Sequence, residues 1–194
     1  MVASRSAEFT YAQWEQIRAH QQAFSGVLAW SAARFNLARG GEARFAEGLY
    51  VSGDFFRQLG VDAILGRTLT AKDDSAACNP GAVLSHAFWL REFGGDPGVL
   101  GRTLSLDGYS IPVIGVTPPS FFGVEVGSRY DVAIPLCADR LLAQDKKGRI
   151  PLPAGWLVAF HHGTLEAGMD GRTRHCPSAR SLAADHASHT SPVV

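Results

Sequence analysis

Residues 79–123 read NPGAVLSHAFWLREFGGDPGVLGRTLSLDGYSIPVIGVTPPSFFG, and this stretch decides the fold. Its first apolar run, residues 82–84, predicts a short buried strand. Ser85 follows as a helix N-cap, because its hydroxyl can accept a hydrogen bond from a free first-turn N–H. Gly94 stands where a helix commonly ends in a left-handed residue. The pattern therefore predicts a helix over residues 86–93.

The second half of the stretch predicts a β-hairpin. Asp96-Pro97-Gly98 is typical of a turn. Apolar runs at residues 103–106 and 109–116 then flank Asp107-Gly108, a strong two-residue hairpin signal. Pro118-Pro119 ends the second strand, since neither residue can donate to a ladder. Nothing in this stretch is a nucleophile, a base or a ligand set, which favours a scaffold role.

The N-terminal part continues the same texture. Thr10 and Gln13 fit a capping box before a helix predicted over residues 11–22. Alternating runs within residues 26–51, interrupted by Gly40-Gly41, predict a long hairpin. A short helix is predicted over residues 55–59 and closed by a glycine.

One five-residue sequence occurs twice. Leu-Gly-Arg-Thr-Leu occupies residues 65–69 and again residues 100–104. Two such short copies are too little to define a solenoid. In both copies we expect the glycine to supply a positive φ or a close approach and the arginine to pair or pack locally.

These elements predict an α+β fold, a mostly antiparallel sheet with two or three short helices packed on one side. Pro112 is expected at an edge or a bulge, because it cannot donate to a ladder. If one of the aromatic residues is exposed, we expect it to be Trp30, which lies in a stretch of small residues. The aromatic residues expected to be buried are Trp14, Phe56, Trp89 and Phe93.

Composition narrows the class of protein. The 194 residues carry 18 basic and 18 acidic side chains, so the formal net charge of zero gives no reason to expect nucleic acid as a partner. No apolar run approaches the roughly 18 residues of a membrane span, and the N-terminus has no apolar signal-peptide core. The three cysteines, an odd number at irregular spacing, decide neither compartment nor pairing.

Two glycine- and histidine-based patterns suggest ligands but do not satisfy the known requirements. Residues 95–103 resemble a phosphate-binding loop, yet the glycine spacing is wrong and an arginine stands in place of the lysine, so a turn before a strand is the favoured interpretation. Cys176, His186 and His189 could be imagined as zinc ligands, but no predicted element would hold them in place. The sequence therefore predicts no metal site and no cofactor.

Three acidic or nucleophilic pairs are likewise assigned no chemistry. Asp73 and Asp74 lack the spacing of a calcium loop and are interpreted as a solvated loop. Asp131 and Glu125 could form an acid/base pair only by chance. Ser85-His86 are sequence neighbours, and adjacency alone does not make a dyad. We therefore predict no catalytic residue. Six aromatic residues could form a ligand-binding cleft, but core packing is the favoured interpretation for them. They are Trp14, Trp30, Phe88, Trp89, Phe121 and Phe122.

The order of these segments resembles one family. The sequence YAQWEQIR, then LYVSGDFFRQLGVDAILGRTL, then AVLSHAFWLREFGGDPGVLGRTLSLDGYSIPVIGVTPPSF and finally DVAIPL is similar to the MacB-like periplasmic core domain of FtsX-like ABC transporter permeases. The resemblance covers residues 9–136. Its most specific pieces are residues 51–56, both Leu-Gly-Arg-Thr-Leu copies, residues 84–86 and residues 93–97.

The resemblance implies a non-enzymatic extracytoplasmic domain, truncated from its membrane helices, that relays ATP-driven motion to cargo or a partner. The implied partners are the rest of an FtsX-like permease, its cytoplasmic ATPase and a periplasmic partner protein, with no cofactor. The implied location is the inner membrane, with this domain on the periplasmic side. The alternatives are a small secreted hydrolase or binding protein, and a non-functional gene fragment.

The expected organisation is a polar leader at residues 1–9, the core domain at residues 10–139 and an atypical tail at residues 140–194. The tail lacks periodicity, so we expect it to be disordered. From about Leu157 it is interpreted as an out-of-frame reading, with a natural disordered tail as the alternative. A strand that would complete the sheet is then expected to be missing. We also expect no Cys78–Cys137 disulfide, since nothing in the sequence brings the two residues together.

Overall fold

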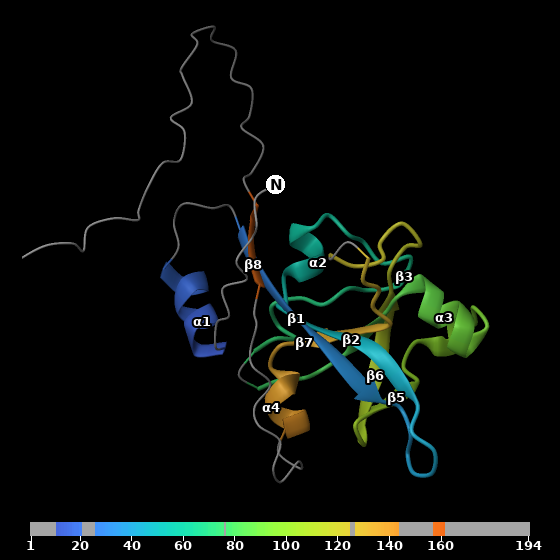
Figure 1. The fold of residues 1–194 in the computed structure, drawn as a ribbon. Helices are drawn as coiled ribbons and strands as arrows, with labels where there is room; N and C mark the ends of the chain where they lie inside the picture. Colours follow the sequence, from blue (N-terminus) through green and yellow to red (C-terminus); the bar gives the residue numbers. More distant parts are fainter. Residues whose placement is uncertain (1–10, 21–25, 76, 125–126, 144–156, 162–194) are drawn as a thin grey trace, which may run out of the picture. The chain divides into compact units, whose positions relative to one another are not determined.

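A computed structural model describes residues 11–20, 26–75, 77–124, 127–143 and 157–161 (Figure 1). These residues form four α-helices, one 3₁₀ helix and eight strands around a mixed sheet. In chain order they are α1 (Tyr11–His20), β1 (Gly26–Asn36), β2 (Phe45–Val51), α2 (Phe55–Gln58), β3 (Leu65–Gly66), β4 (Ala82–Leu84), α3 (His86–Phe93), η1 (Pro97–Val99), β5 (Thr103–Leu106), β6 (Tyr109–Val116), β7 (Val132–Pro135), α4 (Ala138–Ala143) and β8 (Leu157–His161).

The described strands follow the order β3-β6-β4-β7-β2-β1-β8, and β5 pairs with β6. The pairings β2–β7 and β4–β6 are parallel. The other five are antiparallel. The α+β class with a mostly antiparallel sheet is thus confirmed.

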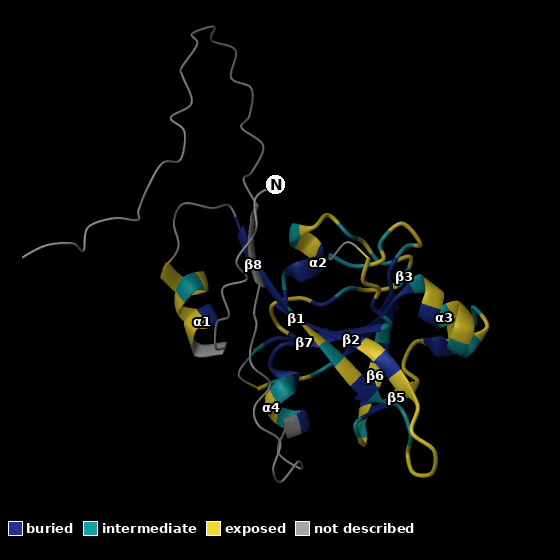
Figure 2. Ribbon diagram, in the orientation of Figure 1, coloured by how far each residue is buried: buried dark blue, intermediate teal, exposed yellow. Residues whose placement is uncertain are grey.

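Alternating residues of the central strands divide the interior into two cores. In β7, Val132 and Ile134 point into the larger core, whereas Ala133 points into the second core on the opposite face. Figure 2 shows how the buried residues concentrate in these strands. Three of the four helices contribute to the larger core and α2 contributes to the second. The expectation of helices on one side therefore holds for α1, α3 and α4 only.

The local signals of the central stretch are confirmed. The Ser85 Oγ accepts a hydrogen bond of 3.2 Å from the Phe88 N–H at the start of α3. Gly94 ends the helix with a φ of 61°. Asp107 and Gly108, with φ values of 52° and 92°, join β5 to β6. Each of these devices acts between near neighbours, which is why the sequence alone located them.

The two Leu-Gly-Arg-Thr-Leu copies lie end to end on one side of β6. The Arg67 N–H donates to the Ile114 carbonyl, and the Gly101 N–H donates to the Val113 carbonyl, each at 2.9 Å. Both glycines adopt a positive φ, 69° at Gly66 and 78° at Gly101. Gly66 also approaches β6 so closely that a Cβ would lie 2.2 Å from the Ile114 carbonyl oxygen.

Each copy's arginine pairs with an aspartate six residues away, as expected. Arg67 bonds Asp73 through two contacts of 2.8 Å, and Arg102 bonds Asp96 at 2.7 Å. The settings differ, because the Asp73 side chain is 8% exposed and the Asp96 side chain is 45% exposed. In the first pair only the aspartate is therefore interior, since the Arg67 side chain is 53% exposed, whereas the second is a solvated surface pair of small energetic value.

The aromatic predictions are confirmed in part. Trp14 and Phe56 are fully buried, and Trp89 and Phe93 are partly buried. The prediction for Trp30 is wrong: it is 5% exposed and its ring lies 6.3 Å from that of Phe55 in the second core. The small residues next to Trp30 leave room for the Phe55 ring, from α2, to pack against it.

Strand β6 tolerates its proline as expected. Pro112 pairs with Thr103 of β5, and β4 begins its pairing only at Val113, one residue further on. The missing N–H therefore faces a position where β6 has no second ladder partner among the described strands.

The returning strand that we expected to be missing is present. Leu157–His161 forms β8, which pairs antiparallel with Gly26–Trp30 of β1. The physical reason is that backbone hydrogen bonding to the free edge of β1 needs no particular side-chain pattern. Thr10 and residues 162–194, with the tail's predicted disorder and His/Cys cluster, lie outside the described residues.

Candidate functional site

Most side chains considered for chemistry have structural roles. Ser85 caps α3, and residues 95–103 form a turn that leads through η1 into β5. Asp131 pairs with Arg91 at 3.0 Å, while Glu125 lies outside the described residues. Cys176, His186 and His189 also lie outside them. In the described ranges no group of three or more His, Cys, Asp or Glu residues is placed to hold a metal ion.

A groove of about 630 Å³ lies between α3 and residues 119–122 and 127–131, and we call it the α3 groove. Leu90 of α3 lines one wall and is 49% exposed. Phe122 lines the other wall and is 61% exposed. Exposed large apolar side chains on both walls of one hollow are typical of a binding surface rather than of ordinary protein surface.

The charges in the α3 groove are unequally compensated. Asp131 accepts hydrogen bonds from Arg91 and from the Glu47 N–H, both at 3.0 Å, so its negative charge is already satisfied. Burial lowers and the Asp131 contact raises the pKa of Arg91, with a net rise. Arg129 also lines the groove, is exposed, and makes no ion pair with another described residue. Among the described residues that line the groove, Arg129 is thus the cation without an ion-pair partner.

The floor of the α3 groove is fixed by buried contacts. Tyr130 is 3% exposed, and its hydroxyl lies 2.6 Å from the Thr117 Oγ1. Burial raises the pKa of Tyr130, so the phenol stays neutral at physiological pH. The Phe121 ring lies 5.7 Å from the Tyr130 ring and 5.8 Å from the Phe56 ring. Phe122 therefore projects from an anchored segment.

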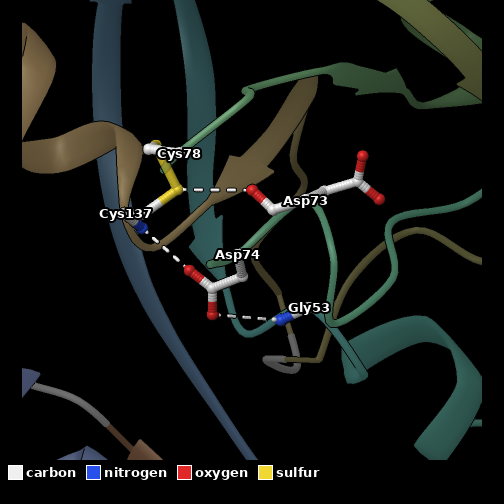
Figure 3. Close-up of a disulfide and its surroundings, with 5 residues drawn as sticks. All are labelled: Gly53, Asp73, Asp74, Cys78 and Cys137. Atoms are coloured by element: carbon white, nitrogen blue, oxygen red, sulfur yellow. Dashed lines mark hydrogen bonds between the residues drawn. A yellow bond between two sulfur atoms is a disulfide. The ribbon is translucent and has the colours of Figure 1, made fainter. Parts of the chain in front are cut away.

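A disulfide joins Cys78 to Cys137, so the prediction that these cysteines stay apart is wrong. Their Cα atoms are 5.6 Å apart although 59 positions separate them in sequence. The bridge ties the loop after β3 to Cys137, which lies between β7 and α4 (Figure 3). The physical reason for the error is that a buried carboxylate, Asp74, draws this loop onto the end of β7.

Asp74 accepts two backbone N–H bonds, from Cys137 at 2.9 Å and from Gly53 at 3.3 Å (Figure 3). The Cys137 Sγ lies 3.3 Å from the Asp73 carbonyl oxygen. Asp73 itself caps the loop by accepting from the Thr70 N–H at 2.8 Å. The solvated-loop interpretation of Asp73 and Asp74 is wrong, since they are 6% and 2% exposed.

The protein shifts the pKa values of the two aspartates in opposite directions. Burial raises the pKa of Asp74 to about 6, although its two N–H bonds and the charge of Arg18 act to lower it. The Arg67 hydrogen bonds lower the pKa of Asp73 to about 2. The sequence offered no common signal for the two pairings, because Asp73 lies six residues after Arg67 whereas Asp96 lies six residues before Arg102, and nothing in the sequence showed which aspartate would be buried.

Replacing Asp74 by Asn is expected to flatten the pH dependence of stability between about pH 4 and pH 6. The folded state holds this proton up to about pH 6, whereas an unfolded Asp loses it near pH 4. Folded protein thus binds more protons in this window, and the free energy of unfolding falls as pH rises by an order of about 2 kcal/mol. Urea unfolding at pH 4, 5, 6 and 7 measures this fall.

Asp96→Asn is the matched control for this prediction, because Asp96 is a partly exposed member of a surface pair. It should leave the slope between pH 4 and pH 6 unchanged. Asp73 contributes in a separate window, since its stabilisation is present above about pH 4 and is lost as the pH falls towards 2. An unchanged slope in Asp74→Asn would contradict the assignment of this window to Asp74.

The fold and its surface together define the class of protein: an α+β domain with one described disulfide and a groove beside α3. A profile of the MacB-like periplasmic core domain matches residues 2–159. The chain therefore belongs to the family of MacB-like periplasmic core domains, which are parts of ABC transporter permeases that work with an ATPase. That family is a class of transport proteins and not an enzyme class.

Solved structures share the fold. The periplasmic region of MacB from Actinobacillus actinomycetemcomitans aligns with 85% of this chain and 71% of its own length, at a TM-score of 0.59 and 16% identity. The extracellular domain of the noncanonic ABC-type transporter YknZ from Gram-positive bacteria aligns with 74% of this chain and 68% of its own, at 0.54 and 17%. Identities this low establish the architecture alone. No curated protein matches the chain.

None of the helices in the described part of the chain is both long enough and apolar enough to cross a membrane.

Proposed function

We propose that this chain acts as the extracytoplasmic domain of an ABC-type permease and relays ATP-driven motion to cargo or a partner protein, without chemistry of its own. The observation that carries the proposal is the arrangement around β1. The first described helix, α1, places Trp14 in the same core as Val27 and Ala29 of β1. The last described strand, β8, pairs with the same part of β1 (Figure 1).

This arrangement suits transmission of force. Strand β1 continues from its pairing with β8 into an antiparallel pairing with β2 that spans Trp30–Asn36. A displacement of either flanking element would therefore act directly on the longest described strand. Packed interiors of this kind move as units because they deform little.

The disulfide supports an extracytoplasmic location. Disulfides persist in the periplasm and outside the cell, whereas reducing systems keep most cytosolic thiols reduced. Cys137 is 5% exposed and the bridge closes the loop after β3, as is typical of a structural bond. This bond is consistent with the proposed location of the domain on the periplasmic side of the inner membrane.

Electron–electron distance measurements on the complete permease, assembled with its ATPase in nanodiscs, test the proposal. Arg39→Cys and Arg57→Cys, both at exposed positions, provide the attachment sites for spin labels. Cys176→Ser first removes the cysteine of this chain that lies outside the disulfide. On addition of ATP and vanadate, the distance from each label to a third label on a membrane helix should change. The Arg39–Arg57 distance should stay constant. Unchanged distances to the membrane helix would overturn the relay.

A further inference from the structure

We propose that the α3 groove binds an extended segment of a partner protein, which inserts an apolar side chain between Leu90 and Phe122 and sets a carboxylate against Arg129. This inference rests on the proposed function, because it names the surface by which the domain would contact a partner. It goes further by assigning that contact to one place and one chemistry.

Each of the two walls of the α3 groove carries an exposed apolar side chain. Leu90 and Phe122 stand on separate elements and both line the groove, at 49% and 61% exposure. A side chain inserted between them would bury apolar surface of all three residues, which is favourable in proportion to the area removed from water. The groove volume of about 630 Å³ is within the range of sites that accept several groups of a ligand.

The charged side chains that line the α3 groove indicate which charge its occupant carries. The groove's carboxylate, Asp131, is already satisfied by Arg91 and the Glu47 N–H. Arg129 has no such partner among the described residues. Arginine and aromatic residues are also the types enriched at protein interfaces. An acidic residue beside the apolar one therefore complements the groove, and a basic residue would be repelled.

The same charges argue against two other occupants. In a symmetric dimer the groove would face its own copy, and Arg129 would approach an equally charged surface. Anionic membranes are recognised by clusters of several Lys and Arg residues, whereas the described lining of the groove has one uncommitted cation. The groove is also preformed, since Tyr130 and Phe121 hold its floor in the second core, which lowers the entropy lost on binding.

A random heptapeptide library displayed on phage, selected against the immobilised full chain, tests the inference. The selected peptides should carry an apolar residue next to Asp or Glu. The best peptide is then synthesised with a fluorescent label, and its Kd is measured by anisotropy. Phe122→Ser and Arg129→Glu should each weaken binding by about tenfold or more, the loss expected for a central interface contact.

Matched controls share the chemistry but lie outside the groove. Phe45→Ser removes another exposed aromatic residue, and Arg39→Glu reverses another exposed charge, so both should leave the Kd unchanged. A twin peptide with Lys in place of its acid should bind Arg129→Glu better than the original chain. Urea unfolding of Phe122→Ser confirms that the variant is folded.

Three results would overturn the inference. The first is a set of selected peptides without acidic residues, or peptides that bind all four variants alike. The second is dimerisation of the chain that Phe122→Ser abolishes, which would make a second copy the occupant. The third is Phe122-dependent binding to phosphatidylglycerol vesicles. If peptide binding fails while the nucleotide-driven distance changes persist, only the groove assignment fails and the proposed function stands.

Discussion

Phe56→Ala is expected to lower the free energy of unfolding by about 3–5 kcal/mol, the range for truncating a fully buried aromatic residue. Phe56 is 0% exposed in the second core. Its ring lies 5.2 Å from that of Phe55 and 5.8 Å from that of Phe121, in edge-to-face geometry at both contacts. The substitution removes these contacts and leaves a cavity between α2 and the anchored segment at Phe121. Urea unfolding of the full chain measures the loss.

Phe122→Ala is the matched control, since it removes the same kind of ring from an exposed position, next to the Phe121 that Phe56 contacts. Phe122 is 61% exposed, so its truncation should change the free energy of unfolding by less than about 0.5 kcal/mol. Equal losses in the two variants would contradict the assignment of Phe56 to the interior and of Phe122 to the surface.

Replacing Cys78 and Cys137 together by Ala is expected to lower the free energy of unfolding by about 2–4 kcal/mol. The bridge spans 59 positions, so removing it frees a long loop in the unfolded chain. In the folded chain it also releases the loop that holds Asp73 and Asp74. A reducing agent should destabilise the original chain by a similar amount and leave the double variant unaffected.

Cys176→Ala serves as the control for the disulfide, because it removes a cysteine without touching the bridge. Its stability should respond to the reducing agent as the original chain does. Three free thiols instead of one in the non-reduced, folded original chain, detected by mass spectrometry after alkylation, would contradict the prediction.

The sequence alone determined the elements whose causes are local. The Ser85 cap and Gly94 bound α3 because both act within one helical turn. Asp107-Gly108 set the β5–β6 hairpin because a two-residue turn fixes the register of its strands. The family resemblance likewise rests on short segments that follow one another in the family's order along the chain.

The sequence could not determine which distant segments meet. The copies at Arg67 and Arg102 have the same local sequence, yet only the first pairs with a buried aspartate. The α3 groove likewise exists because the segment after β6 folds back beside α3, which leaves Phe122 exposed while Phe121 is anchored.

The local sequence therefore determined the helices, the hairpins and the turn chemistry of this protein, because those depend on residues within a few positions of one another. Only the tertiary structure decided the Cys78–Cys137 bridge, the burial of Asp73 and Asp74 and the pairing of β8 with β1. The physical reason is that each of these requires chain closure over tens of residues. The free energy of such closure depends on the packing of the whole domain rather than on the residues that finally touch.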